Sequence, residues 1–363
     1  MRTLIALAAA MTAVTGESCS LDDLDLEAGW EIEPFELPRL PHPVSNNAVT
    51  AVIADGNEYL ISFNGLGPGR THADVHARTF VFNGDEWREA EPVPGGVGRL
   101  ASVAVSLGEE AWVFGGYTVA EDGSEVSTPW THSFDPVSGE FEVHAPMPVP
   151  VDDAVAVVYE DRYVYLISGW HDYGNVNLVQ RYDAQTDSWT QATPTPGPAV
   201  FGHAGGIAGN RIVYCDGVVV APQILERRQF EATDQCLLGI IDADNPRRID
   251  WQRIPPHPGP ARYRMAATGI AIDGDSGVWF LGGSDNPYNY DGIGYNGEPS
   301  QPVPGAFVWD FESNEWFEFA TVSEPTMDHR GLVIYREAFV TVGGMHSDQE
   351  VIDAVYAYGD DDE

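Results

Sequence analysis

Arginine, histidine and aromatic side chains that could bind a small molecule gather at two kinds of position in this sequence of 363 residues. One kind comes directly before a short apolar run, and the other lies in a loop that follows a glycine. An arginine fork suits a carboxylate or a phosphate, and an aromatic ring suits the face of a sugar. The candidate ligand-binding residues of the first kind are Arg99, Asp153, His203, Arg264 and Arg330, and those of the second kind are Arg70, His72, Trp170, His171, Tyr288, Tyr290 and His346.

The arginines are the most informative members of this set. Arginine supplies all 18 basic residues, against 56 acidic ones. A local group of arginines in so acidic a chain would form a selective site for an anion. The alternative is that each arginine pairs with a neighbouring carboxylate, such as Asp152 or Asp328. If the arginines serve a ligand, Arg264→Ala should abolish binding and leave the melting temperature nearly unchanged.

The stretch 284–302 is a long loop with no helical or strand period. Tyr288, Tyr290 and Tyr295 stand in it among glycines and asparagines. Such a loop could stack its rings on a sugar while its amides bind the hydroxyl groups. It could equally be a self-packed loop that covers the site. The sequence leaves both interpretations open.

Motifs for metals, nucleotides and nucleophilic catalysis are weak or missing. His72 and His76 have the spacing of metal ligands, but no third ligand stands beside them in the sequence. There is no P-loop, dinucleotide fingerprint or nucleophile elbow. The sequence therefore predicts no metal site and no cofactor, and it leaves any catalytic residue unknown.

Two markers recur along the chain at intervals of roughly 50 to 65 residues. The first is a glycine that closes an apolar run, and the second is a pair of aromatic residues seven apart that brackets a turn. Four short apolar or alternating runs fit each repeat, which is typical of short β-strands. The glycines are Gly65, Gly116, Gly169, Gly217, Gly283 and Gly344, and the aromatic pairs are Phe80/Trp87, Phe134/Phe141, Tyr182/Trp189 and Trp309/Trp316.

These markers resemble the kelch repeat, over roughly residues 30–359. The cleanest copy is Tyr182-Asp-Ala-Gln-Thr-Asp-Ser-Trp189. The resemblance implies an all-β fold, a six-bladed kelch-type β-propeller in which each repeat forms one four-stranded blade. Both kinds of candidate position then lie on one face of the ring, which we call the top face. Arg99, Arg264 and Arg330 should converge there at the mouth of the central channel, with His203 between them.

The ring is expected to be closed by its N-terminal strand. The last repeat has runs near 330–335, 338–343 and 351–358, and then the chain ends. Residues 30–38 supply a further apolar stretch, in which Trp30 resembles Trp189 and Trp316. We therefore predict that 30–38 forms the outer strand of the last blade. Pairing the two ends would leave no free sheet edge there.

Two cysteines are expected to form a disulfide. Cys215 ends the second strand of the fourth repeat, and Cys236 begins the third. Those strands should be neighbours, and an oxidising compartment favours the bond. The alternative is a pair of free buried thiols.

The N-terminus resembles an export signal. Residues 1–18 combine a basic start with an apolar stretch too short to span a membrane, and 19–29 read as an acidic tether. Cleavage after Gly16 and lipidation of Cys19 are both open. We expect export, to the periplasm, the outer membrane as a lipoprotein, or the medium. Residues 360–363 read as a disordered acidic tail.

The net charge of −38 excludes some partners. Such a surface repels nucleic acid and anionic membranes, so a lipid anchor is the one membrane contact we expect. It also suits solubility in a salty medium, where self-repulsion is screened. We expect a monomer whose partner is a small acidic or carbohydrate ligand, or a protein on the top face.

Three functions compete. The first is a binding propeller for an acidic or carbohydrate ligand. The second is an enzyme, because the stretch from Pro94 to Pro136 is similar to bacterial N-acetylneuraminate epimerases, which implies a sugar epimerase or mutarotase. That family has Gly-Glu in the fourth blade and an arginine six residues later, whereas Val218 and Ile224 stand here. The third is a protein-interaction scaffold.

Overall fold

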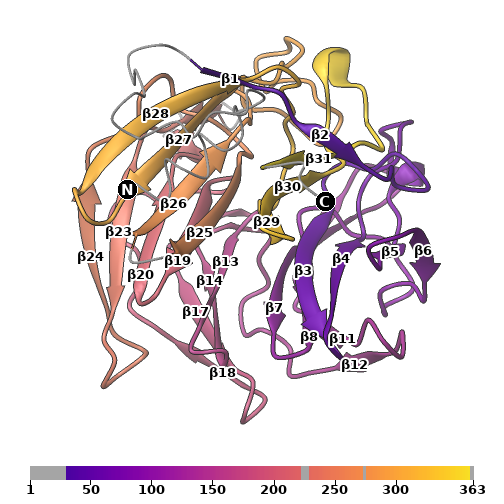
Figure 1. The fold of residues 1–363 in the computed structure, drawn as a ribbon, viewed down its shortest axis with the longest axis horizontal. Helices are drawn as coiled ribbons and strands as arrows, with labels where there is room; N and C mark the ends of the chain where they lie inside the picture. Colours follow the sequence, from indigo (N-terminus) through magenta and orange to yellow (C-terminus); the bar gives the residue numbers. More distant parts are fainter. Residues whose placement is uncertain (1–29, 222–228, 273–274, 360–363) are drawn as a thin grey trace, which may run out of the picture.

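Short antiparallel sheets surround a central axis in the computed structural model (Figure 1), which describes residues 30–221, 229–272 and 275–359. Within those residues, six sheets of four core strands form six blades. The prediction of a six-bladed β-propeller is confirmed. The predicted signal segment 1–18, the tether 19–29 with Cys19, and the tail 360–363 lie outside the described residues.

The first four blades follow the order of the chain. Blade 1 holds β3 (Ala48–Ala54), β4 (Asn57–Phe63), β5 (Thr79–Phe82) and β6 (Trp87–Ala90). Blade 2 holds β7 (Val103–Leu107), β8 (Glu110–Phe114), β11 (Thr131–Phe134) and β12 (Phe141–Val143). Blade 3 holds β13 (Val155–Tyr159), β14 (Tyr163–Ile167), β17 (Val179–Asp183) and β18 (Ser188–Gln191). Blade 4 holds β19 (Ala204–Ala208), β20 (Arg211–Cys215), β23 (Cys236–Ile241) and β24 (Ile249–Ile254).

The last two blades include the N-terminal strands. Blade 5 holds β25 (Ala266–Ile272), β26 (Asp275–Leu281), β27 (Gly305–Asp310) and β28 (Glu315–Val322), with β1 (Trp30–Ile32) parallel to β28 at its outer edge. Blade 6 holds β29 (Val333–Tyr335), β30 (Ala338–Val342) and β31 (Val355–Tyr358), and β2 (Phe35–Leu37) pairs with β31 as its outer strand.

The predicted closure is therefore right for 35–37 and wrong for Trp30. Strand β2 completes the last blade, as expected from the missing strand of the sixth repeat. Trp30 pairs with Ala320 of blade 5 instead. The reason is a break at residues 33–34, which belong to neither strand, so the expected single strand is divided and its first half extends the neighbouring sheet.

The blades are held together by apolar faces that meet their neighbours. In β13 the side chains alternate between buried and half-buried positions, and β14 is buried throughout, because a blade is covered on both faces. Val105 and Phe114 of blade 2 pack with Val164 and Tyr182 of blade 3. Equivalent clusters join each successive pair of blades, including blade 6 with blade 1.

The aromatic marker has a clear structural role. The indole nitrogen of Trp189, on the outer strand of blade 3, donates to the carbonyl of Ala145 at 2.8 Å. Trp87 donates to Pro38 at 2.6 Å in the same way, and Trp316 donates to Pro255 at 2.7 Å. Each tryptophan thus ties the outer strand of its blade to the segment that leaves the preceding blade.

The glycine marker marks a close backbone approach. Gly116 has a φ of 85°, and a Cβ there would lie 2.2 Å from the Ser102 hydroxyl oxygen. Gly169 has a φ of 103°, and a Cβ there would lie 2.6 Å from the Asp152 carbonyl oxygen. A side chain at either position would clash with the start of the blade's inner strand, so only glycine fits.

Connections between the second and third strands carry extra structure on the top face. Blade 2 inserts the ribbon β9 (Tyr117–Val119) and β10 (Glu125–Ser127), blade 3 the ribbon β15 (Trp170–His171) and β16 (Gly174–Asn175), and blade 4 the ribbon β21 (Val218–Ala221) and β22 (Gln229–Ala232). Blades 1 and 6 insert the short turns η2 (His72–Asp74) and η3 (Ser347–Gln349).

The predicted disulfide is confirmed. Cys215 and Cys236 are bonded, and they are paired partners on the adjacent strands β20 and β23. The bond therefore lies at the base of the β21–β22 ribbon. Among the described residues, no helix has the length and apolar character needed to cross a membrane.

Candidate functional site

One residue of each blade, just before the inner strand, has a left-handed backbone. Neighbouring positions are joined around the axis by main-chain hydrogen bonds: Asp153 N–H donates to Ala101 O at 3.1 Å, Gly202 N–H to Asp153 O at 2.9 Å, and Arg264 N–H to Gly202 O at 2.8 Å. The left-handed turn lets these three N–H groups face the preceding blade, and we call the six left-handed residues the axial ring. Its members are Asn46, Ala101, Asp153, Gly202, Arg264 and Asp328.

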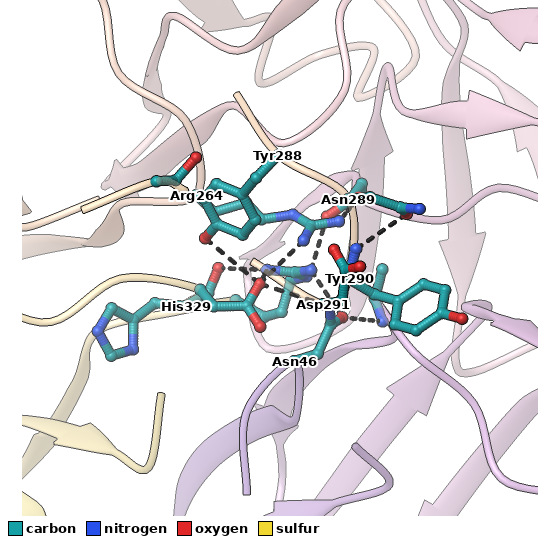
Figure 2. Close-up of polar contacts among 12 residues, drawn as sticks. Asn46, Arg264, Tyr288, Asn289, Tyr290, Asp291 and His329 are labelled. Atoms are coloured by element: carbon teal, nitrogen blue, oxygen red, sulfur yellow. Dashed lines mark hydrogen bonds and ion pairs between the residues drawn. The ribbon is translucent and has the colours of Figure 1, made fainter. Parts of the chain in front are cut away.

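Two arginines and two aspartates meet inside the axial ring. Arg264 lies 2.6 Å from Asp153 and 3.0 Å from Asp328, measured from guanidinium nitrogen to carboxylate oxygen. Arg330 lies 3.0 Å from the other oxygen of Asp153 and also donates to Asn46 Oδ1 at 2.7 Å. Figure 2 shows Arg264 and Asn46 in this group, which we call the axial charge cluster.

The axial charge cluster is closed to solvent. The side chains of Arg264, Arg330, Asp153 and Asp328 are all at most 3% exposed. Burial alone would raise the pKa of Asp153, but Arg264 and Arg330 outweigh it and hold that pKa below its usual value. Burial opposes the charge of Arg264 too, yet Asp153 and Asp328 leave its pKa well above its usual value. Both shifts favour the charged forms of Asp153 and Arg264, which therefore form an ion pair.

Arg264 and Arg330 therefore match the structural alternative, in which each arginine pairs with a carboxylate. Aromatic rings complete the surroundings of Arg264, whose guanidinium carbon lies 4.6 Å from the ring centre of Tyr263 and 5.2 Å from that of Tyr288. Arg264 presents no unpaired charge to an incoming anion.

Two predicted members of the channel mouth lie outside the charge cluster. Arg99 is fully buried, donates to Gly115 O at 2.7 Å and stacks over Trp130, so it does not converge with the other arginines as expected. Its position before Leu100 turns it outward into blade 2 instead of toward the axis. His203 bonds Ile167 O at 3.0 Å, and burial lowers its pKa to about 4, which makes it neutral.

A cavity of about 520 Å³ lies on the top face, above the axial charge cluster. One wall is aromatic. The ring centres of Trp170 and Phe201 are 5.4 Å apart, those of Phe201 and Phe230 are 5.8 Å apart, and those of Phe230 and Tyr295 are 4.3 Å apart. These rings come from blade 3, blade 4 and the long loop of blade 5, so the wall exists only in the folded ring.

Carboxyl groups also line the top-face cavity. Glu125 of β10, Asp152 and Asp172 line it, with Asp153 and Arg264 of the charge cluster. Asp152 Oδ2 accepts from the Ser127 hydroxyl at 2.7 Å, and Asp172 Oδ1 accepts from Ser127 N–H at 2.9 Å. Burial, and then the neighbouring Asp153, raise the pKa of Asp152 well above its usual value and so favour the protonated form of this carboxyl group.

Comparison with known proteins places this architecture. No protein-family model matches the chain. The chain is 25% identical over 189 residues to Kelch-like protein terF of Aspergillus terreus, and 27% identical over 185 residues to Beta-scruin of Limulus polyphemus. The solved structure of YjhT superposes with a TM-score of 0.68 at 15% identity, covering 88% of this chain and 96% of that one.

The chain is a kelch-type β-propeller. The matched regions are 52% and 48% of this chain, but only 37% of Kelch-like protein terF and 19% of Beta-scruin. The kelch propeller thus corresponds to a part of each of these longer relatives, and the likeness to YjhT concerns the fold.

Arg70 and the predicted tyrosines, Tyr288 and Tyr290, make different contacts in the kelch propeller. Arg70 donates to Asp291 O at 2.7 Å and so anchors the long loop of blade 5. Tyr288 is fully buried beside Arg264, as Figure 2 shows, and its ring is not available to a ligand. Tyr290 is directed away from Arg264 (Figure 2), whereas Tyr295 lines the cavity. The loop thus packs on itself and also supplies one ring to the cavity.

The remaining histidines of the predicted set lie at the periphery of the top face. His72 is exposed in η2. His171 contacts Pro150 O at 2.8 Å, and His346 contacts the Tyr356 hydroxyl at 2.9 Å. The described residues hold no group of three metal-ligating side chains, so the spacing of His72 and His76 is not part of such a group there.

Sequence reasoning missed several residues of the top-face cavity, among them Tyr117, Glu125, Asp172, Phe201 and Phe230. A signal for one of them existed. Tyr117 directly follows Gly116 as Trp170 follows Gly169, and both form a bridge to the residue before the axial ring. Glu125 and Phe230 lie on inserted ribbons, where no repeat marker gives the register.

A second cavity, of about 330 Å³, lies in the central channel. The inner strands line it with small residues such as Gly206 and Gly269, and Asp153 and Arg330 lie at its edge. Asp153 also lines the top-face cavity, so the axial charge cluster separates the two spaces.

Proposed function

We propose that this kelch propeller is a binding protein that takes a carbohydrate in its top-face cavity. The observation that carries the proposal is the continuous aromatic wall, from Trp170 to Tyr295, in a cavity that carboxyl groups also line. A cavity of about 520 Å³ is within the range that small-molecule sites occupy.

The aromatic rings and the carboxyl groups of the cavity would bind different parts of a sugar. The C–H face of a sugar ring packs on flat aromatic surface, which Phe230 and Tyr295 offer together. The carboxyl groups of Glu125 and Asp172 can accept hydrogen bonds from sugar hydroxyls, and Asp152, whose raised pKa favours the protonated form, can also donate one. The aromatic rings thus suit the C–H face of a sugar, and the carboxyl groups suit its hydroxyl groups.

A small acid fits the cavity less well than a carbohydrate does. The charge of Arg264 is already matched by Asp153 and Asp328. A carboxylate ligand would therefore meet the carboxyl groups of the cavity without a free guanidinium group to compensate its burial. Of the two predicted ligand classes, we retain the carbohydrate.

Catalysis gains no support from the described residues. Val218 stands where the epimerase resemblance implies a glutamate, and its side chain is fully buried. Ile224, at the position that the resemblance assigns to an arginine, lies outside the described residues. We therefore propose binding without an assigned reaction.

Binding is tested by screening the purified chain on a glycan array and measuring the hits by calorimetry. Phe230→Ala and Tyr295→Ala should each weaken the affinity by roughly tenfold, because each removes about 0.5–1.5 kcal/mol of ring contact together with buried area. Val143→Ala is the matched control, since Val143 is 73% exposed on the outer strand of blade 2. An array without any hit, or wall variants that bind like the control, would refute the proposal.

A protein partner on the top face is a second candidate. The ribbons around the cavity carry exposed apolar side chains, with Val126 at 54%, Tyr173 at 82% and Val220 at 36% exposure. Such side chains on a rim are typical of interaction surfaces. Tyr173→Ser should then prevent capture of the partner by the immobilised propeller while glycan binding persists.

Export of a monomeric chain completes the proposal. The expected signal segment 1–18 and the Cys215–Cys236 disulfide both suit an oxidising compartment. Mass spectrometry of the mature N-terminus decides between cleavage after Gly16 and a lipidated Cys19. A retained Met1 in the natural host would contradict export.

A further inference from the structure

Resting on the proposed carbohydrate binding, we infer that the ligand of the top-face cavity is an amino sugar that carries a free ammonium group. The cavity combines aromatic faces with carboxyl groups, while the guanidinium group that lines it is already paired. That combination recognises an organic cation.

Among the described residues that line the cavity, acidic side chains outnumber basic ones. Arg264 is the basic residue in the described lining, and its two terminal nitrogens are taken by Asp153 and Asp328. Glu125, Asp152 and Asp172 also line the cavity, and none of them forms an ion pair with another described residue. A neutral sugar would leave Glu125 and Asp172 without a cation, whereas an ammonium group supplies one.

The aromatic wall favours the same charge. The face of an aromatic ring carries negative electrostatic potential and attracts a cation placed within about 6 Å of its centre. Trp170, Tyr117, Asp152 and Glu125 line the same cavity, and the backbones of Trp170 and Asp152 are paired directly. An ammonium group there would contact ring faces and carboxylates together, and the sugar ring would occupy the Phe230–Tyr295 surface.

Ligand binding should be coupled to the protonation of Asp152. Its side chain is 3% exposed and is held by the Ser127 hydroxyl, and the groups that act on it are Asp153, Glu125 and Arg264. In the free protein, burial raises the pKa of this carboxyl group and favours its neutral form. A bound ammonium group would lower that pKa and release the proton. Binding should therefore release protons to the buffer, which a neutral sugar would not cause.

The test compares a glucosamine disaccharide with the N-acetylated disaccharide of the same linkage, using the full chain at pH 7 and 0.15 M NaCl. We expect the free amine to bind at least tenfold more tightly, with proton release visible as a dependence of the calorimetric heat on the buffer. Equal or tighter binding of the N-acetylated sugar would overturn the charge inference and leave the proposed function intact. Binding of neither sugar, nor of any neutral glycan, would overturn both.

Variants separate the cavity from the general attraction of an acidic protein for cations. Glu125→Gln should reduce the preference for the amine to less than threefold, and Asp152→Asn should abolish the proton release. Glu142→Gln is the matched control, because it makes the same charge change on the outer strand of blade 2, outside the cavity lining. If Glu142→Gln reduces the preference as much as Glu125→Gln does, the cation binds diffusely and the inference is wrong.

Discussion

Arg264 Nη2 lies 2.6 Å from Asp153 Oδ2, although 111 residues separate the two in the chain. The pair spans the axis of the propeller, from blade 5 to blade 3, and both residues have left-handed backbone conformations. Asp328 of blade 6 contacts the same guanidinium group at 3.0 Å. Three blades are thus joined by one buried arginine, in addition to the apolar contacts between neighbouring blades.

Arg264→Ala should destabilise the fold by roughly 3 to 5 kcal/mol, because it leaves buried carboxylates without their partner. Urea unfolding followed by tryptophan fluorescence measures the change. This outcome differs from the sequence-based expectation of an unchanged melting temperature. The double variant Arg264→Ala with Asp153→Asn should lose less than the sum of the two single changes.

Arg248→Ala is the control for that comparison. Its side chain is 74% exposed and lies 4.0 Å from Asp242, so its removal should change the stability by less than about 1 kcal/mol. If Arg264→Ala is as stable as Arg248→Ala, the axial arginine is not needed for the fold and is available to a ligand.

Acid should destabilise the propeller through its buried histidines. Burial lowers the pKa of His203 and of His329 to about 4, below the ordinary value of 6.5. Their stabilising effect is complete above pH 6.5 and is lost as the pH falls toward 4, because the unfolded chain takes up the protons first. By pH 5 the loss should be about 2 kcal/mol for each histidine.

The measurement is the difference between the natural chain and His203→Gln in unfolding free energy at pH 7.5, 6 and 5. A difference is needed because Asp152 has the opposite effect on the unfolding free energy. Its raised pKa makes the folded protein more stable as the pH falls. His203→Gln should show the weaker dependence on pH. Parallel curves for the two proteins would mean that His203 does not titrate on unfolding.

Removal of the disulfide should lower the stability by about 3 kcal/mol on the loop-entropy model. The bond joins residues 21 apart in sequence and closes the β21–β22 ribbon. Cys215→Ser with Cys236→Ser, compared with the natural chain under oxidising conditions, measures this contribution by urea unfolding. Under reducing conditions the two proteins should become nearly alike. Peptide mapping that finds both thiols free in the oxidised protein would contradict the bond.

Salt should stabilise the propeller. The net charge of −38 makes the folded surface repel itself, and dissolved ions screen that repulsion. The unfolding midpoint should rise between 0.05 M and 1 M NaCl, whereas an uncharged osmolyte at matched osmolality should have a smaller effect. A midpoint that falls with added NaCl would show that attractive surface pairs outweigh the repulsion.

The repeat pattern contains enough information to predict the ring. Gly116 and Gly169 recur because the backbone of the inner strand passes too close for any side chain. Trp189 and Trp316 recur because their indole groups bond to the segment leaving the preceding blade. These are local requirements that recur from blade to blade, so they can be recognised in the sequence. Cys215 and Cys236 follow from the same register.

The strand at the N-terminus shows where local similarity fails. Trp30 resembles Trp189 in its surroundings in the sequence, but it pairs in parallel with blade 5, while residues 35–37 complete blade 6. Which blade each N-terminal segment joins depends on where the strand is interrupted and on which outer sheet edge is unpaired. Neither is encoded by a repeat marker.

The candidate site divides in the same way. The sequence by itself determined which positions face the top of the ring, and it placed Arg264, Asp153 and Trp170 among them. Only the tertiary structure decided that Arg264 is paired with Asp153 while Asp152, one residue earlier, lines the cavity with its pKa raised by burial. The physical reason is that side-chain direction at the axis follows from the left-handed turn and the closure of six blades, and the resulting neighbours come from blades far apart in the chain.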